Sequence, residues 1–495
     1  MMRVGCAFLL LSLAILQASG FPRVASGLAG TDWNKNPGFK ARITQKGLNF
    51  LRDLGLETLR DKIQHLTIPD VSGRASVKVG HINYEVKNIR ITSFNIPTAF
   101  LTTNPSAGGL RLTTSGISLS VHGNWHYKST GFIHVSDSGS FDARASSISM
   151  ALSIRVGVDS TGRPTISSAR SDCSFHVSGM NVDLHGGASW LYNLFDHKIA
   201  DSLKDSVNKK VCPEVLDAVN IQLENKLKTL KMEARFLHVA DIDYTLVAPP
   251  VFNGSVNTAH KGEVYAHGSK TECPLPVPGV RADSDTSRMV FLWITDYLPN
   301  SAGYVLQEVG YLQYNVTKDN VPEAEKDYLN TGNFAYKFAI PQLNFMYPSM
   351  DMQINIKSTK PPVITMKENG ISANLVGEFS PYAILPNKTL AYLFTLKVSI
   401  AAEVSVSFKD NNITWSLSSL STDISRVKTE IGWFSSTLLE VAVNSAITLY
   451  FLPLMNQIGG VGVPLPQIDD LDFSNPVVTH GQNFIKIGTD LIFKE

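Results

Sequence analysis

The stretch VHGNWHYKSTGFIHVSDSGSFD, residues 121–142, places aromatic and basic side chains next to one another. Trp125, His126, Tyr127 and Lys128 are consecutive, and the alternating residues around them are typical of two strands joined by a loop. A cation binds phosphate through a charge-assisted hydrogen bond, and Trp and Tyr suit a boundary between water and hydrocarbon. At the tip of a hairpin, this combination predicts contact with an apolar and anionic surface. The alternative is that Trp125 is a buried hairpin residue.

Motifs for catalysis and metal binding are absent from the sequence. It contains no G-x-S-x-G elbow, no H-E-x-x-H pair and no P-loop. Cys173 and His176 are three residues apart on a predicted strand, so their side chains point to opposite faces. The other histidines and aspartates lack a recognisable metal-ligand spacing. We therefore expect a binding protein, not an enzyme, with neither metal nor cofactor.

Charge is divided unevenly along the chain, although the formal net charge is only +1. Residues 21–248 hold 26 Lys+Arg against 20 Asp+Glu, a net of +6, whereas residues 249–495 hold 17 against 23, a net of −6. Nine of the twelve histidines also lie in the first part. This division predicts an anionic partner for the first part, unless it is a chance feature of a two-domain chain. The surplus is too dilute to predict nucleic-acid binding.

Residues 1–20 have the pattern of a secretory signal peptide. Arg3 precedes an apolar run over residues 4–16, and Ala18-Ser19-Gly20 offers a small-residue cleavage site. The run is too short to cross a hydrocarbon layer of about 30 Å as a helix. We expect a secreted, extracellular protein, released directly or after storage in granules.

Three cysteines follow the predicted signal peptide, namely Cys173, Cys212 and Cys273, so at most one bridge forms within the chain. Pairing of Cys173 with Cys212 is favoured because it would join a strand end to the following helix. Cys273 would then be a free thiol, and a buried one rather than a reactive one.

Four Asn-x-Ser/Thr glycosylation sequons all lie in the second part, at Asn253, Asn315, Asn387 and Asn412. If glycans occupy these sites in a glycoprotein, the second part faces solvent and the first part carries no N-linked glycan.

Hydrophobic periodicity predicts a similar order of elements twice. In the first part we expect a helix over 39–66, alternating strands over 67–182, a helix over 187–230 that Cys212-Pro213 interrupts, and a linker that starts at 247–250. In the second part we expect a segment over 301–316 that starts with a helical stretch, alternating segments over 334–424, a long apolar helix over 436–458 and a strand over 483–493.

This order predicts an α+β protein with two domains, residues 21–248 and 249–495. Each would be an elongated antiparallel barrel wrapped around one long and one short helix. A twisted sheet that does not close fully leaves a slot between helix and sheet. Acyl chains can fill such a slot, and each buried methylene contributes about 0.8 kcal/mol.

Six segments, spread over almost the whole mature chain, resemble the family of bactericidal permeability-increasing and lipopolysaccharide-binding proteins. In chain order they are NPGFKARITQKGLNF, WLYNLFDHKI, DYTLVAPP, SRMVFLWITDYLPNSAGYVLQEVG, GVPLP and HGQNFIKIGTDLIF. The resemblance implies a boomerang of two barrels with pseudo-twofold symmetry, joined by a central sheet. It also implies one phospholipid in an apolar pocket of each barrel, and the disulfide Cys173–Cys212.

In this family the far tip of the N-terminal barrel binds lipid A and anionic membranes. The resemblance places that tip in segments 72–81, 122–132 and 183–198. The candidate binding residues within them are Arg74, Lys78, Trp125, His126, Lys128, His197 and Lys198.

The tip differs from that of strongly bactericidal members, which is crowded with lysines. Histidines stand at several of its positions, namely His81, His122, His126, His185 and His197. Histidine becomes charged below about pH 6. We therefore expect binding to anionic vesicles to strengthen as the pH falls from about 7.5 to about 5.5.

Together these features predict a secreted, monomeric protein of innate immunity that binds lipopolysaccharide of Gram-negative bacteria through its N-terminal tip. It would be antibacterial or present endotoxin, and its C-terminal domain would contact a cell-surface receptor. The alternative is a secreted lipid transfer or carrier protein without an antibacterial role.

Overall fold

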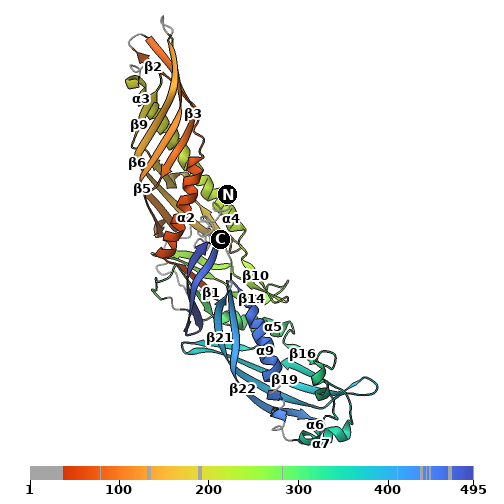
Figure 1. The fold of residues 1–495 in the computed structure, drawn as a ribbon. Coiled ribbons are helices and arrows are strands. Elements are labelled where there is room, and N and C mark those ends of the chain that lie inside the picture. Colours follow the sequence, from red (N-terminus) through yellow and green to blue (C-terminus); the bar gives the residue numbers. More distant parts are fainter. Residues whose placement is uncertain are drawn as a thin grey trace.

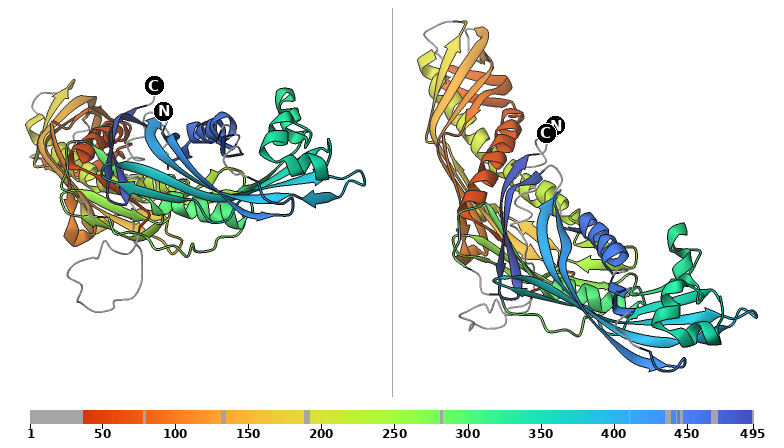
Figure 2. Two further views of the ribbon diagram at one scale, coloured as in Figure 1. Left: turned by 90° about the horizontal axis from the view of Figure 1, so that it is seen from below. Right: turned by 60° about the horizontal axis from the view of Figure 1, so that its bottom comes forward.

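A computed structural model describes residues 37–77, 80–130, 135–187, 192–280, 283–409, 411–434, 439–441, 443–444, 447–465 and 471–493. The chain forms a bent rod in which a central sheet separates an N-terminal half from a C-terminal half (Figures 1 and 2). The predicted signal peptide lies outside the described residues.

The N-terminal half is built on one eight-stranded antiparallel sheet, in the order β2-β3-β5-β6-β7, with β4 on β5 and with β8 and β9 on β6. Its strands are β2 (Val71–Val77), β3 (Gly80–Asn95), β4 (Thr98–Asn104), β5 (Gly109–Ser129), β6 (Ser136–Val158), β7 (Pro164–Ser167), β8 (Cys173–His176) and β9 (Gly179–His185). Along most of β5 and β6 buried and more exposed side chains alternate, as the two-residue period predicts.

Two long helices pack on this sheet, α2 (Gln45–Gln64) against β3 and β4, and α3 (Tyr192–Asp217) against β8 and β9. The hydroxyl of Thr44 caps α2 by accepting a hydrogen bond from the backbone N–H of Gly47. The predicted helix over 39–66 therefore starts too early. Its first residues form strand β1 (Phe39–Ile43), which is buried on both faces, so its apolar pattern does not distinguish strand from helix.

Helix α3 continues through Pro213, and the predicted interruption there is wrong. A π-helical segment (Ala218–Leu223) and α4 (Glu224–Lys228) prolong it. Val211 and Val215, on either side of the proline, are buried. Their burial offsets the cost of the backbone hydrogen bond that proline cannot make.

The central sheet joins strands from both ends of the chain, in the order β12-β13-β1-β15-β25-β24. Besides β1 it contains β12 (Leu246–Phe252), β13 (Val256–His260), β15 (Val290–Thr295), β24 (Leu471–Gly481) and β25 (Phe484–Phe493). The segment 247–250 is thus not a linker but part of edge strand β12. Pro249 and Pro250 sit there at a register shift, where no ladder N–H is needed.

Beside the central sheet lies a three-stranded sheet of β10 (Glu233–Phe236), β11 (Ala240–Asp243) and β14 (Glu263–Ala266). Helix α5 (Tyr297–Glu308) packs against β14, and its second half overlaps the start of the segment where a helical stretch is predicted. The predicted division into two domains after residue 248 falls inside β12 and stays a prediction.

The C-terminal half repeats the plan of a curled sheet covered by helices. Its eight strands are β16 (Gln313–Val316), β17 (Met352–Ser358), β18 (Val363–Lys367), β19 (Gly370–Ile384), β20 (Leu390–Tyr392), β21 (Phe394–Lys409), β22 (Asn412–Thr429) and β23 (Val463–Pro464). Its helices are α6 (Phe334–Ala339), α7 (Pro341–Met346), a π-helical segment (Ile447–Phe451) and α9 (Leu452–Val461). The alternating strands therefore begin near residue 352 and not at 334, because two short helices come first.

Two curled antiparallel sheets with helices, joined by a central sheet, confirm the predicted α+β fold class (Figure 2). One large apolar core extends from the N-terminal half through the central sheet to the adjoining strands of the C-terminal half, and a second core lies within the C-terminal half. Among the described helices, none has the length and apolar character to cross a bilayer.

Candidate functional site

The far end of the N-terminal half, where β2, β3, β5, β6 and β9 approach the start of α3, contains the three predicted tip segments (Figure 1). We call their described part the N-terminal tip: residues 72–77, 80–81, 122–130, 183–187 and 192–198. Lys78, one of the predicted binding residues, lies outside the described residues.

The aromatic residues at the tip are buried, contrary to the expectation that they reach the water–hydrocarbon boundary. Strand β5 extends to Ser129, so Trp125 and Tyr127 lie within a strand and not in a loop. They are 6% and 2% exposed, and their rings stack at 5.9 Å. The indole Nε1 of Trp125 donates a hydrogen bond to the carbonyl oxygen of Ser140 at 2.9 Å. Trp125 is thus the buried hairpin residue of the alternative interpretation.

The basic residues of β2 and β5 point outward. His126 and Lys128 alternate with the buried aromatic residues and are exposed, as is Arg74. Arg74 opposes Asn83, which in turn opposes Lys128, so the two cations share one row across three strands. With a strand spacing of about 4.8 Å, their backbones are about 10 Å apart. Such a row can face two anionic groups on one surface.

His197 and Lys198 lie near the start of α3 and are exposed. They belong to the helix and not to the outer face of the sheet, so the structure does not place them in the row of Arg74 and Lys128. Among the described residues, Arg74, Lys128 and Lys198 form no ion pair within 4.0 Å.

An aspartate that is not among the predicted site residues lies between two of the tip histidines. One carboxylate oxygen of Asp142 is 2.9 Å from Nδ1 of His122, and the other is 3.0 Å from Nε2 of His185. The hydrogen bond with His122, assisted by that with His185, holds the pKa of Asp142 below its usual range. Asp142 opposes His122 in the hairpin register, so pairing the two strands about their loop would have found it.

The disulfide forms as predicted, whereas Cys273 is less buried than expected. Cys173, at the start of β8, is bonded to Cys212 in α3, with their Cα atoms 5.8 Å apart. Cys273 is free and half-buried, and burial raises the pKa of its thiol. A thiol that resists ionisation is a poor nucleophile, as expected for a structural cysteine.

The predicted glycosylation sites differ in exposure. Asn253, Asn315 and Asn387 are exposed, whereas Asn412 is half-buried and its amide nitrogen is 3.5 Å from the carbonyl oxygen of Val461. Among the described residues, no cluster of three or more His, Cys, Asp or Glu is arranged to hold a metal ion.

Comparison with known proteins matches both halves of the chain to one family. Residues 47–230 match the N-terminal domain model of the LBP / BPI / CETP family, and residues 234–493 match its C-terminal domain model. The bactericidal permeability-increasing protein of Sebastes schlegelii is 30% identical over 460 residues, which cover 92% of this chain and 96% of the relative. The lipopolysaccharide-binding protein of Homo sapiens is 28% identical, with coverage of 92% and 94%.

The phospholipid transfer protein of Mus musculus is also similar, at 25% identity with coverage of 92% and 90%. A crystal structure of lipopolysaccharide binding protein superposes with a TM-score of 0.63 at 27% identity, covering 93% of this chain and all of the other. These matches extend over both halves and the central sheet. The chain therefore belongs to the LBP / BPI / CETP family.

Proposed function

We propose that this chain is a secreted lipid-binding protein that recognises lipopolysaccharide and anionic membranes with its N-terminal tip. In each half, phospholipid acyl chains would occupy the space between sheet and helices. Family membership supports the coarser part, because the proteins of this family are non-enzymatic and bind lipids. On the same ground the chain is not an enzyme.

The observation that carries the proposal is the incompletely buried apolar lining of the C-terminal half. On the inner face of β21, Val404, Val406 and Phe408 are each only half-buried. Strand β22 contacts α9, an apolar helix in which Gly459 alone is fully buried. Half-buried apolar groups on both a sheet and the helix that covers it are what a bound acyl chain would shield from water.

In the N-terminal half the inner face of the sheet is more completely covered. Half-buried apolar residues remain at its edge, on β9, namely Met180, Val182 and Leu184. We place the second acyl-chain site along this edge.

The tip supports recognition of an anionic headgroup. Arg74 and Lys128 are exposed cations in one row, and lipid A presents phosphates on a hydrophobic surface. Near an anionic surface each cation contributes about 1 kcal/mol. The relatives named for binding lipopolysaccharide, or for increasing bacterial permeability, favour this ligand over other anionic lipids.

A carrier of phospholipid without an antibacterial role is the second candidate. The small number of cations at the tip and the similarity to a phospholipid transfer protein favour it. Secretion through residues 1–20, a monomeric state, glycan occupancy and a receptor contact of the C-terminal half stay predictions.

A double substitution tests the tip directly. Arg74→Ala with Lys128→Ala should weaken binding to lipopolysaccharide-containing vesicles about 30-fold, because about 2 kcal/mol of attraction is lost. The matched control is Lys209→Ala with Lys210→Ala, which removes the same charge from α3 away from the tip. Equal weakening by both pairs would show that net charge, and not the tip, governs binding.

The same variants separate the two lipid sites. Phospholipid that co-purifies with the protein should be unchanged in the tip variant, because Arg74 and Lys128 lie on β2 and β5 and not on the strands that line the acyl-chain sites. If lipopolysaccharide affinity and phospholipid content fall together, the tip is not a separate site. A wild-type protein that moves phospholipid between vesicles but does not bind lipopolysaccharide would favour the carrier.

A further inference from the structure

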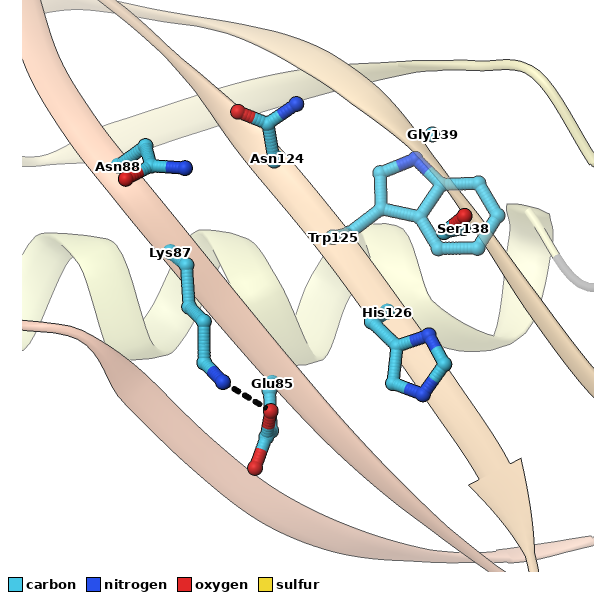
Figure 3. A pocket seen from close by; sticks show the side chains of 8 residues that line it. All are labelled: Glu85, Lys87, Asn88, Asn124, Trp125, His126, Ser138 and Gly139. Atoms are coloured by element: carbon cyan, nitrogen blue, oxygen red, sulfur yellow. Dashed lines mark ion pairs between the residues drawn. The ribbon is translucent and has the colours of Figure 1, made fainter.

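A hollow of about 270 Å³ opens on the outer face of the N-terminal sheet, where β3, β5 and β6 run side by side. Figure 3 shows the eight lining residues on neighbouring strands, with a helix behind the sheet. The volume equals the space of about nine waters in the liquid. This is room for one small ring and not for an extended chain.

A β-bulge in β3 builds one wall of the hollow. Lys87 opposes Asn124, but Arg90 already opposes His122, so β3 carries an extra residue at this point. Asn88, in the bulge, has a φ of 55°, a left-handed conformation that asparagine tolerates better than most residues. As a result Lys87 and Asn88 are both exposed, although consecutive residues in a regular strand would point to opposite faces.

A glycine in β6 builds the opposite wall. Gly139 opposes Trp125, and a Cβ atom there would lie 2.0 Å from the carbonyl oxygen of His185 and 2.8 Å from the indole. The position therefore excludes every larger residue, and backbone lines the hollow beside Ser138. The indole of Trp125 lies buried against this wall, where its N–H donates to the carbonyl oxygen of Ser140.

Four polar side chains that line the hollow remain available to hydrogen-bond with a ligand. Within the described residues no hydrogen bond is formed by the side chains of Asn88, Asn124, His126 and Ser138. Together they supply two amides, one imidazole and one hydroxyl, each of which can both donate and accept. Groups of this kind match a ligand that carries several hydroxyls on a compact frame.

The charge of the lining selects against an anion. Lys87 and Glu85 form an ion pair at 2.6 Å, so the cation is already neutralised and a carboxylate stands at the same rim (Figure 3). The pair lowers the pKa of Glu85 and raises that of Lys87, so both stay charged. A phosphate would meet the carboxylate, whereas a neutral hydroxyl can hydrogen-bond to either partner.

We propose that this hollow binds one neutral hexopyranose ring of a glycan. Asn88 and Asn124 would hydrogen-bond to its hydroxyls, with Ser138, His126 and the ion pair around its edge. The inference builds on the proposed function in one respect. If the tip holds the lipid anchor of lipopolysaccharide, the ring is a sugar of the attached saccharide, presented along the outer face of the sheet.

Binding of simple sugars tests the hollow without reference to lipid. Saturation-transfer NMR on the full chain would use methyl glucoside, methyl galactoside and methyl mannoside, with inorganic phosphate as the anionic probe. We expect at least one glycoside to bind with millimolar affinity and phosphate not to compete. Asn124→Leu should weaken that binding at least tenfold. Asn88→Gly, which keeps the left-handed backbone but removes the amide, should do the same.

Asn181→Leu is the matched control, since it changes an exposed asparagine on the same face of the sheet but outside the hollow. No binding of any glycoside, displacement by phosphate, or equal weakening by the control would each overturn the inference.

Two further measurements separate this inference from the proposed function and identify the source of the sugar. If glycosides bind but lipopolysaccharide vesicles do not, the proposed function is refuted and the sugar site is supported. If lipopolysaccharide vesicles bind but glycosides do not, the sugar site is refuted and the proposed function is supported. Asn124→Leu should weaken binding to saccharide-bearing lipopolysaccharide several-fold and leave binding to lipid A unchanged. Equal loss on both would overturn the assignment to a sugar.

Discussion

Trp125 and His126 are neighbours in the chain, yet one is buried against the core and the other lies on the outer face of the sheet. The difference follows from the two-residue period of β5. The inner residue stabilises the end of the sheet by stacking and by its hydrogen bond to Ser140. The outer residue is left available for a ligand.

Substitution of each neighbour should therefore have a different effect on stability. Trp125→Ala should lower the free energy of unfolding by about 3–5 kcal/mol, because it leaves a cavity and an unpaired carbonyl. His126→Ala should change it by less than about 0.5 kcal/mol. Urea denaturation of both variants gives the comparison. A small loss of unfolding free energy in Trp125→Ala would contradict a packed interior at the tip.

Residue types at the tip could be predicted from the sequence, but their orientations could not. The pattern predicts a loop at Trp125–Lys128, residues that lie inside a 21-residue strand. Gly123 has a packing reason, since a Cβ there would lie 2.6 Å from the ring of Phe141. The neighbouring residues in the sequence do not reveal that a glycine makes room for a ring on the next strand.

At the scale of elements, the central sheet contains a buried histidine that joins β13 to the segment before β12 and to β1. His260 in β13 is 3% exposed. Its Nδ1 is 2.9 Å from the carbonyl oxygen of Tyr244, and its Nε2 is 2.9 Å from the hydroxyl of Thr258. These contacts fit a neutral ring that donates once and accepts once. Phe39 of β1 packs its ring edge-on against the histidine.

The stability of the protein should depend on pH through this residue. Burial lowers the pKa of His260 to about 4. Between about pH 6.5 and about pH 4 the unfolded chain binds a proton that the folded chain does not, so stability is full above that window and falls as the pH drops through it. We expect a loss of about 2 kcal/mol from pH 7.5 to pH 5.

Chemical denaturation at the two pH values measures this loss. His260→Gln keeps polar groups at the site but cannot titrate, so it should remove about that much of the difference. A variant with the same pH profile as the wild type would show that His260 is not the group responsible.

The disulfide connects another pair of elements, β8 and α3. Its removal by Cys173→Ser with Cys212→Ser should lower the free energy of unfolding by about 4 kcal/mol, because the sequence separation of 39 residues sets the loop entropy released in the unfolded chain. Thermal unfolding of the wild type with and without reductant provides the check. Unchanged stability after reduction would contradict a structural role.

Long elements could be predicted from the sequence because their periodicity extends over many residues. The positions of their ends could not. The strands of the N-terminal sheet and the final strand match the expectation. The start of α2, the path through Pro213 and the strand at Pro249-Pro250 do not. In each of these places tertiary contacts override the local signal of the residue types.

At the scale of the whole molecule, positive charge and histidines are concentrated toward the N-terminal part of the chain. Four of the five tip histidines lie close to a carboxylate: His122 and His185 flank Asp142, His126 opposes Glu85, and His197 is beside Asp196. The fifth, His81, is paired with Ser76. Protonation of these rings would make the tip more positive.

Binding to anionic vesicles should therefore strengthen several-fold between about pH 7.5 and about pH 5.5. Co-sedimentation at constant ionic strength measures the affinity, and zwitterionic vesicles provide the control, on which pH should have little effect. Equal affinity for anionic vesicles at both pH values would refute a role for the histidines.

The central claim is that the protein carries lipid between its curled sheets and their covering helices. Native mass spectrometry of the secreted protein, before and after extraction with organic solvent, tests it most directly. We predict a mass excess of one or two phospholipids that extraction removes, with lipid then identified in the extract. A protein whose native mass equals that of its polypeptide and glycans, with no lipid in the extract, would contradict the claim.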